Sequence, residues 1–267
     1  MLYCGANWQP NGVKRVIETF QTSTRVALVA TNVGNGFLKG MGNPAGNMSL
    51  AAELVAGELA HWFGLPIPPF AVINLSGEIE IPMIDGGPLL AGPAFISKEV
   101  DGFSGAAGIS KISNPADVSR LIVFDTWVRN ADRCAPEPFG YPPNYDNLFF
   151  TRSASKFQLT ALDHSQAFVE SGVEDSLSDP YLLTDDEVYG YFPEFADLVD
   201  SGAVMDAAGK LRQIVPATVH EIIASIPAAW AISDSARASW ADVILARARA
   251  VADYLPPKLL VNPGLGL

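Results

Sequence analysis

The sequence predicts an α+β protein in which strands occupy the first part of the chain and helices the last part. Three short apolar segments, separated by polar or glycine-rich turns, fill residues 13–39 and are typical of β-strands. Near the other end, apolar residues at helical spacing predict a long helix over 235–255. Because apolar residues make up 49% of the 267 residues, the chain can bury one large core or the cores of two lobes.

The three predicted strands are VKRVIETF, RVALVAT and GFLKG, and the NVGN turn between the last two predicts a hairpin. The connection before the second strand carries Thr22, Ser23, Thr24 and Arg25. This composition is ordinary for a polar turn, and it lacks a glycine-rich phosphate motif. Lys39 ends the third strand, where a lysine is usually a solvent-exposed strand end.

A helix is predicted to begin near residue 47 or 49 and to end at Phe63, before a glycine. It carries two acidic residues, Glu53 and Glu58. On a helical projection, Glu58 falls inside the broad apolar arc, whereas Glu53 lies outside it. A carboxylate on the packed side needs a partner, so the periodicity favours Glu58 as the glutamate with a buried contact.

The middle of the chain predicts further strands and one helix. Two segments have the composition of strands, LPIPPFAVINL and EIEIPMI. The segment GPAFISKEV suits either a connection between lobes or a buried strand, and residues 101–113 have the composition of a loop. Asn114 and Pro115 begin a helix that extends to about Val128, with Asp125 on its apolar face. A buried carboxylate needs hydrogen-bond donors, which the backbone amides of the following loop could supply.

Polar side chains stand at the ends of the next apolar segments. Residues 148–150 and 157–162 have the length of short strands joined by the turn SASK, which predicts Asn147 and Asp163 at the same open end of one hairpin. Their oxygens suit magnesium, which takes one or two carboxylates from a protein together with phosphate oxygens and water. Asp132, on the loop before the hairpin, is placed to orient an attacking hydroxyl and accept its proton.

The last part of the chain is acidic and then helical. From Asp175 onward, acidic residues predict a solvated face or loop. Helices are predicted over 216–226 and 235–255, and Pro256 and Pro257 are expected to end the second before an extended tail.

Several of these segments together resemble the HipA-like kinases. The motifs are NADR, then DNLFF, then LTALDHSQAF, in that order, and the resemblance extends upstream to FLK and to residues 49–68. The catalytic segment is also similar to that of phosphatidylinositol 3-/4-kinases. The resemblance implies a bilobal, protein-kinase-like fold, with a β-rich N-terminal lobe over 1–97 and a mainly helical C-terminal lobe over 98–267.

The resemblance also implies roles for the polar residues. Asp132 would be the catalytic base, and Asn147 and Asp163 would bind Mg²⁺. A departure from the family lies between them, because CAPEPFGYPPNYD separates Asp132 from Asn147 and leaves Asn144 or Asp146 as alternatives to Asn147. Cys134 stands where the family often has histidine.

On the nucleotide side, the resemblance implies that Lys39 contacts the phosphates of ATP and pairs with a glutamate of the next helix. Alignment with the family favours Glu53 and the helical periodicity favours Glu58; we take Glu53 and keep Glu58 as the alternative. The resemblance also implies a loop that covers the phosphates, formed by Thr22, Ser23, Thr24 and Arg25. It further implies a connection between the lobes that contacts adenine, formed by Phe95, Ile96 and Ser97.

The function implied is an ATP- and magnesium-dependent phosphotransferase that acts on a protein Ser/Thr hydroxyl, with a protein substrate or an antitoxin-like protein as partner. The alternatives are a lipid or small-molecule kinase and a pseudokinase that binds nucleotide or protein without turnover. A plain α+β interaction protein that does not bind nucleotide is the third.

Charge and composition indicate which classes of partner and which cellular compartment to expect. A net charge of −12 disfavours nucleic acid or an anionic membrane as the principal partner. Two cysteines, Cys4 and Cys134, fit a reducing compartment better than a disulfide framework. No apolar run approaches the roughly 20 residues of a membrane span, and the N-terminus lacks a signal-peptide pattern, so we expect a cytoplasmic protein.

Overall fold

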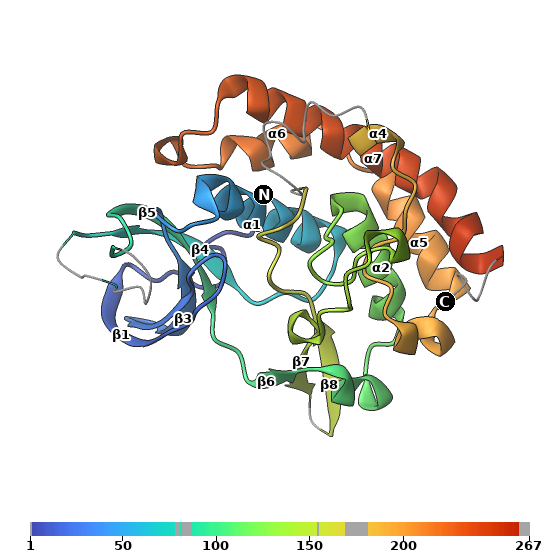
Figure 1. Ribbon diagram of the computed structural model, residues 1–267, viewed down its shortest axis with the longest axis horizontal. Helices are drawn as coiled ribbons and strands as arrows, with labels where there is room; N and C mark the ends of the chain where they lie inside the picture. The colour runs from blue at the N-terminus through green and yellow to red at the C-terminus, as the bar shows by residue number, and fades with distance from the viewer. Residues whose placement is uncertain (1, 78–80, 82–86, 154, 169–180, 262–267) are drawn as a thin grey trace.

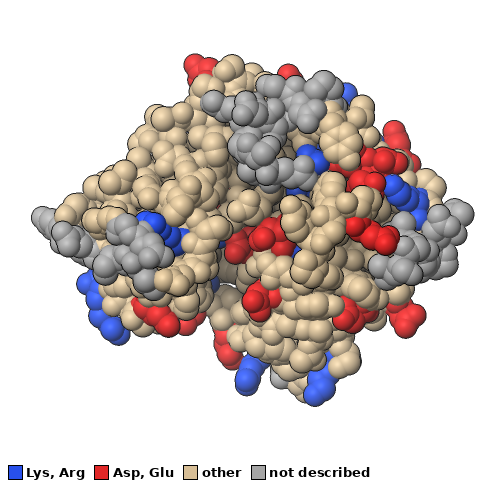
Figure 2. Space-filling view, viewed as in Figure 1, with Lys and Arg blue, Asp and Glu red and all other residues tan. Residues whose placement is uncertain are grey.

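The computed structural model describes residues 2–77, 81, 87–153, 155–168 and 181–261. A β-rich first part and a helical second part lie side by side, which is the bilobal α+β arrangement expected from the sequence (Figure 1). In the space-filling view the two parts meet at a hollow bordered by acidic side chains (Figure 2).

The first part is built on an antiparallel five-stranded sheet in the order β1-β2-β3-β5-β4. The predicted hairpin is confirmed, because Thr31 pairs with Gly34 across the turn between β2 and β3. Of the predicted strand over 78–84, all residues except Ile81 lie outside the described residues. The strands are β1 (Val13–Thr19), β2 (Ala27–Thr31), β3 (Gly34–Lys39), β4 (Phe70–Leu75) and β5 (Gly92–Lys98).

Helix α1 (Gly46–Phe63) lies between this sheet and the helical part. Its apolar side chains are buried around most of its circumference, as expected for a helix that is covered on more than one side. Glu53 and Glu58 are both buried as well, at 5% and 2% exposure. The choice of Glu58 from helical periodicity assumed that this helix has one apolar face and one exposed face. The helix has no such contrast.

A second sheet holds the predicted metal-binding hairpin. It contains β6 (Gly102–Ser104), β7 (Phe149–Ser153) and β8 (Lys156–Thr160) in that order, and the hairpin of β7 with β8 is confirmed. The prediction of a loop over 101–113 is wrong, because this segment forms β6 and a 3₁₀ helix, η1 (Ala106–Lys111). A Cβ at Gly102 would lie 2.3 Å from the Phe150 carbonyl oxygen, so only glycine permits this close pairing.

The second part is mainly helical. It contains α2 (Ala116–Val128), α4 (Tyr181–Thr184), α5 (Ser201–Leu211), α6 (Pro216–Ala224), α7 (Asp234–Val261) and the 3₁₀ turns η2 (Glu137–Phe139), η3 (Tyr145–Asn147), η4 (Pro193–Leu198) and η5 (Ala228–Trp230).

Helix α7 corrects the expected stop at Leu255 and the extended tail after it, since it continues through Pro256 and Pro257 to Val261. Pro256 cannot bond the carbonyl of Ala252, and that carbonyl accepts a hydrogen bond from Arg212 Nη2 at 2.6 Å instead.

The acidic segment is only partly a solvated face. Asp185 is 2% exposed, and its Oδ2 lies 2.5 Å from Arg129 Nε and 2.7 Å from the Tyr189 hydroxyl. This carboxylate therefore anchors the segment to the end of α2, which corrects the expectation for this residue.

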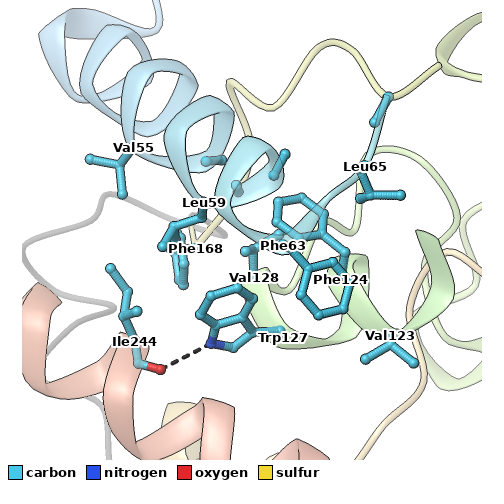
Figure 3. Close-up of a cluster of buried hydrophobic side chains, with 14 of the residues drawn as sticks. Val55, Leu59, Phe63, Leu65, Val123, Phe124, Trp127, Val128, Phe168 and Ile244 are labelled. Atoms are coloured by element: carbon cyan, nitrogen blue, oxygen red, sulfur yellow. Dashed lines mark hydrogen bonds between the residues drawn. The ribbon is translucent and has the colours of Figure 1, made fainter. Parts of the chain in front are cut away.

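One apolar core joins the two parts through α1. Val55, Leu59 and Phe63 of α1 meet Phe124 and Trp127 of α2 in one cluster (Figure 3). The indole of Trp127 donates a hydrogen bond of 2.9 Å to the Ile244 carbonyl of α7. The elements that carry the polar site are thus fixed to a common core.

In the part of the chain described here, none of the helices combines the length and the apolar character that crossing a membrane requires.

Candidate active site

Three buried or half-buried charges lie in a row where the two parts meet. Lys39, at the end of β3, lies with Nζ 2.7 Å from Glu53 Oε2 and 2.8 Å from Asp163 Oδ1. Burial alone would lower the pKa of Lys39, but the carboxylates of Asp163 and Glu53 raise it above its ordinary value. The lysine is therefore a fixed cation at the point where the two parts meet.

Asp163 follows β8 in the left-handed backbone region, at φ 54°. Burial would raise the pKa of its carboxyl group, but Lys39 and the Ser165 hydroxyl hold this pKa well below its usual range. Ser165 Oγ donates to the same oxygen, Oδ1, at 2.9 Å. Both contacts use Oδ1, and within the described part of the chain no hydrogen bond engages Oδ2, while the side chain is 33% exposed.

Of the two candidate glutamates, Glu53 is the one that contacts Lys39. Its other oxygen accepts a hydrogen bond from the backbone N–H of His164 at 3.1 Å. Glu58 instead accepts from the backbone N–H groups of Tyr3 and Cys4, at 2.8 and 2.7 Å. The helical periodicity, which favoured Glu58 as the partner of Lys39, is therefore wrong on this point, because Glu58 binds the N-terminal segment instead.

Asp132 and Asn147 lie together although 15 positions separate them in the chain. Asn147 Nδ2 donates to Asp132 Oδ2 at 2.7 Å, which leaves the amide oxygen of Asn147 as its remaining acceptor. Of the alternatives to Asn147, Asn144 accepts from the backbone N–H of Asp146 at 3.2 Å, and Asp146 is exposed. The geometry favours Asn147 as the amide of the site.

Arg133 holds this arrangement together and is fully buried, at 0% exposure. Its Nε donates to Asp125 Oδ2 at 2.7 Å, one terminal nitrogen donates to the carbonyl of Asn147, and the other donates to the carbonyl of Leu162 at 2.9 Å. One side chain thus connects α2, the amide of the site and the residue before Asp163. The position of Arg133 next to Asp132 in the sequence suits a residue that holds the loop or one that binds a phosphate, and the structure shows that it holds the loop and also reaches the hairpin.

The donors to Asp125 differ from those expected. The sequence argument expected backbone amides of the next loop, whereas the donors are the side chains of Arg133 and Asn130. Burial raises the pKa of Asp125 to about 6 even though both donors lower it.

The polar side chains of the loop before β2 differ in how exposed they are. Thr24 is buried at 2% exposure, and Thr22 Oγ1 accepts from the backbone N–H of Val26 at 3.2 Å. Ser23 is exposed, and Arg25 adopts φ 49° in the turn. Thr24 is therefore poorly placed to reach a phosphate, while Ser23 and Arg25 remain at the surface.

The residues expected to contact adenine are Phe95, Ile96 and Ser97. These residues lie on β5, which has β3 on one side and β4 on the other, so the sheet engages their backbone groups. Ile96 is fully buried in the core on the far side of the sheet. Only the side chains of Phe95 and Ser97 face the site, where they line a cavity of about 30 Å³.

His164 closes the same small cavity and is 3% exposed. Its Nε2 has no hydrogen-bond partner in the described part of the chain, and its ring packs edge-on against Phe124. Burial lowers the pKa of His164 from 6.5 to about 3, so the folded protein keeps the ring neutral.

This shift predicts a pH-dependent stability. Between pH 6.5 and 3 the unfolded chain binds a proton at His164 that the folded chain does not, so stability is present above this range and is lost as the pH falls. From pH 7 to 5, the free energy of unfolding should fall by about 2 kcal/mol more in wild type than in His164→Gln. Urea denaturation at both pH values measures the difference. His220→Gln, at an exposed position, is the control, and equal falls in wild type and His164→Gln would contradict the prediction.

Among the described residues, no group of three or more His, Cys, Asp or Glu side chains is arranged to hold a metal ion by itself. The two predicted ligands, Asp163 and Asn147, would leave most of a cation's coordination to a bound molecule or water.

Comparison with known proteins adds a family and a fold. A family model described as HipA-like kinase matches residues 16–254. Among solved structures, the chain is similar to the crystal structure of a Helicobacter pylori proinflammatory kinase, CtkA, with a TM-score of 0.57 and 12% identity, over 92% of this chain and 96% of that one. No curated protein sequence matches this chain.

Proposed function

Because this chain belongs to the HipA-like kinase family, we propose that it transfers the terminal phosphoryl group of ATP to a serine or threonine hydroxyl of a protein. The observation that carries the proposal is the ion pair of Lys39 with Glu53 and Asp163, joined through Arg133 to the pair of Asp132 and Asn147. In this arrangement the carboxylate that pairs with the fixed cation and the carboxylate that would orient the hydroxyl lie on segments that one buried arginine connects.

The donor set fits a magnesium ion. Asp163 keeps Oδ2 for a ligand, and Asn147 keeps its amide oxygen, since the amide nitrogen is committed to Asp132. One carboxylate and one amide oxygen match the small number of protein ligands that Mg²⁺ takes beside phosphate. Magnesium bound there would neutralise negative charge on the phosphates.

In the proposed reaction, Lys39 binds phosphate oxygens, and Ser23 and Arg25 cover the phosphates. Asp132 orients the acceptor hydroxyl and takes its proton. The hydroxyl oxygen forms a bond to the terminal phosphorus, the bond from that phosphorus to the bridging oxygen breaks, and ADP leaves. We assign residues 1–97 and 98–267 to the two lobes, with ATP between them. The unpaired thiols of Cys4 and Cys134 support a reducing compartment such as the cytoplasm.

Nucleotide binding gives the first test. Millimolar ATP with magnesium should raise the thermal midpoint of the wild type by about 5 °C, because a ligand that binds only the folded state stabilises it by mass action. Asp163→Ala should lose this rise, whereas Asp146→Ala, at an exposed position beside the site, should keep it.

A wild type without any rise would contradict nucleotide binding. A rise without transfer of radiolabelled phosphate from ATP to added protein would instead favour a binding module over an enzyme.

A further inference from the structure

The insertion that separates Asp132 from Asn147 forms one wall of a groove of about 570 Å³. The opposite wall is the chain over 187–193, and Lys258 of α7 lies at the groove as well. The surface is rich in proline and tyrosine, and Tyr141 at its edge is 70% exposed. Proline- and aromatic-lined grooves suit an extended peptide, which presents side chains without secondary structure of its own.

Hydrogen bonds hold the two walls in place. The backbone N–H of Gly190 donates to the Cys134 carbonyl at 2.9 Å, and the Cys134 thiol lies 3.2 Å from the Tyr191 carbonyl. Farther along the insertion, the Tyr145 hydroxyl donates to Glu194 at 2.7 Å. The groove is therefore formed before any partner binds, and its first lining residue, Cys134, follows Asp132 by two positions.

The groove is acidic. Glu137 and Glu187 line it, and Lys258, its one basic side chain among the described lining residues, donates to the carbonyl of Asp186 at 2.6 Å. Along the chain, no Lys or Arg stands in 134–151 or in 157–209, the two segments from which both walls come. Lys258 offsets one of the two glutamates, so the described lining residues keep a net negative charge.

We propose that this groove docks an extended, positively charged segment of the acceptor protein and so presents a neighbouring serine or threonine to Asp132. The proposal rests on the proposed function for the presented hydroxyl, but docking itself is a binding event. Glu137 and Glu187 supply the charge complementarity, and the proline and tyrosine side chains supply the contact surface.

The test is peptide binding without ATP. The probe is a fluorescein-labelled, proline-containing peptide of about twelve residues that carries arginines near a serine, compared with the same peptide in which citrulline replaces each arginine. Fluorescence anisotropy should show the arginine peptide binding wild type about tenfold more tightly. Glu137→Gln with Glu187→Gln should weaken the arginine peptide about five- to tenfold and leave the citrulline peptide unchanged.

The matched control removes two acidic charges elsewhere. Asp206→Asn with Asp242→Asn removes the same amount of negative charge at exposed positions. Residue 242 stands 16 positions before Lys258 on α7, about 24 Å away along the helix axis. This variant should bind the arginine peptide nearly as wild type does. An equal loss in the control, equal affinity for both peptides, or no loss in the groove variant would each overturn the proposal.

Phosphorylation assays separate this proposal from the proposed function. If the peptide binds as expected but receives no phosphate, the docking site stands and the enzymatic assignment fails. If it is phosphorylated with the same KM by wild type and by the groove variant, the enzymatic assignment stands and the docking site fails.

Discussion

Asp132→Asn is expected to lower the rate of phosphoryl transfer by about 10²- to 10⁴-fold, the usual effect of losing a general base. Asparagine keeps an oxygen that can accept the hydrogen bond from Asn147, so the local structure is preserved. It cannot take up the proton of the acceptor hydroxyl. Affinity for ATP should stay nearly unchanged, because the charges proposed to hold the phosphates come from Lys39 and the loop before β2.

The measurement is single-turnover transfer of labelled phosphate together with ATP affinity by calorimetry. Asp146→Asn is the matched control, since it makes the same chemical change at an exposed position close by. A full rate in Asp132→Asn would refute the assignment of the base. An equal loss in the control would show that the change acts through the charge of the loop instead.

Arg133→Met is expected to lower the free energy of unfolding by about 3–5 kcal/mol, because it leaves the buried carboxylate of Asp125 without its ion-pair partner. The substitution keeps a long side chain, so the loss comes mainly from the three hydrogen-bonded contacts. Those contacts also align Asn147 and Asp163, so residual folded protein should transfer phosphate slowly.

Urea denaturation near neutral pH measures this effect, and the same substitution at an exposed pair is its control. Arg152 Nε lies 3.6 Å from Asp101, with the two side chains 69% and 78% exposed, and Arg152→Met should cost less than about 1 kcal/mol. Adding Asp125→Asn to Arg133→Met should recover part of the loss, since no unpaired buried charge then remains. Equal costs at the two arginines would contradict the role given to Arg133.

Local patterns in the sequence predicted β1 to β4, the hairpin of β7 with β8 and the positions of α1, α2, α6 and α7. Turn composition and residue alternation are local properties, and the hairpin needed nothing else. The choice between Glu53 and Glu58 was different, because α1 is buried on several sides and its apolar arc carries no directional information. The family alignment favoured Glu53, and the structure shows that Glu53 contacts Lys39.

Other errors came from partners distant in the chain. The continuation of α7 past its prolines depends on Arg212, which lies 40 positions before the carbonyl that it satisfies. The place of β5 in the middle of its sheet was likewise not predicted, because a single strand does not reveal the order of strands in a sheet. The three contacts of Arg133 likewise join segments that only the folded chain brings together.

The insertion after Arg133 begins and ends at nearly the same point, because the backbone N–H of Asn144 donates to the Arg133 carbonyl at 2.9 Å. A surface loop closed at its base can change length at little cost, since each doubling adds only about 0.6 kcal/mol of closure entropy. Evolution can therefore lengthen, shorten or replace this loop while the residues at its base keep their positions. Members of one family can in this way acquire new acceptors while the residues that carry out the transfer stay the same.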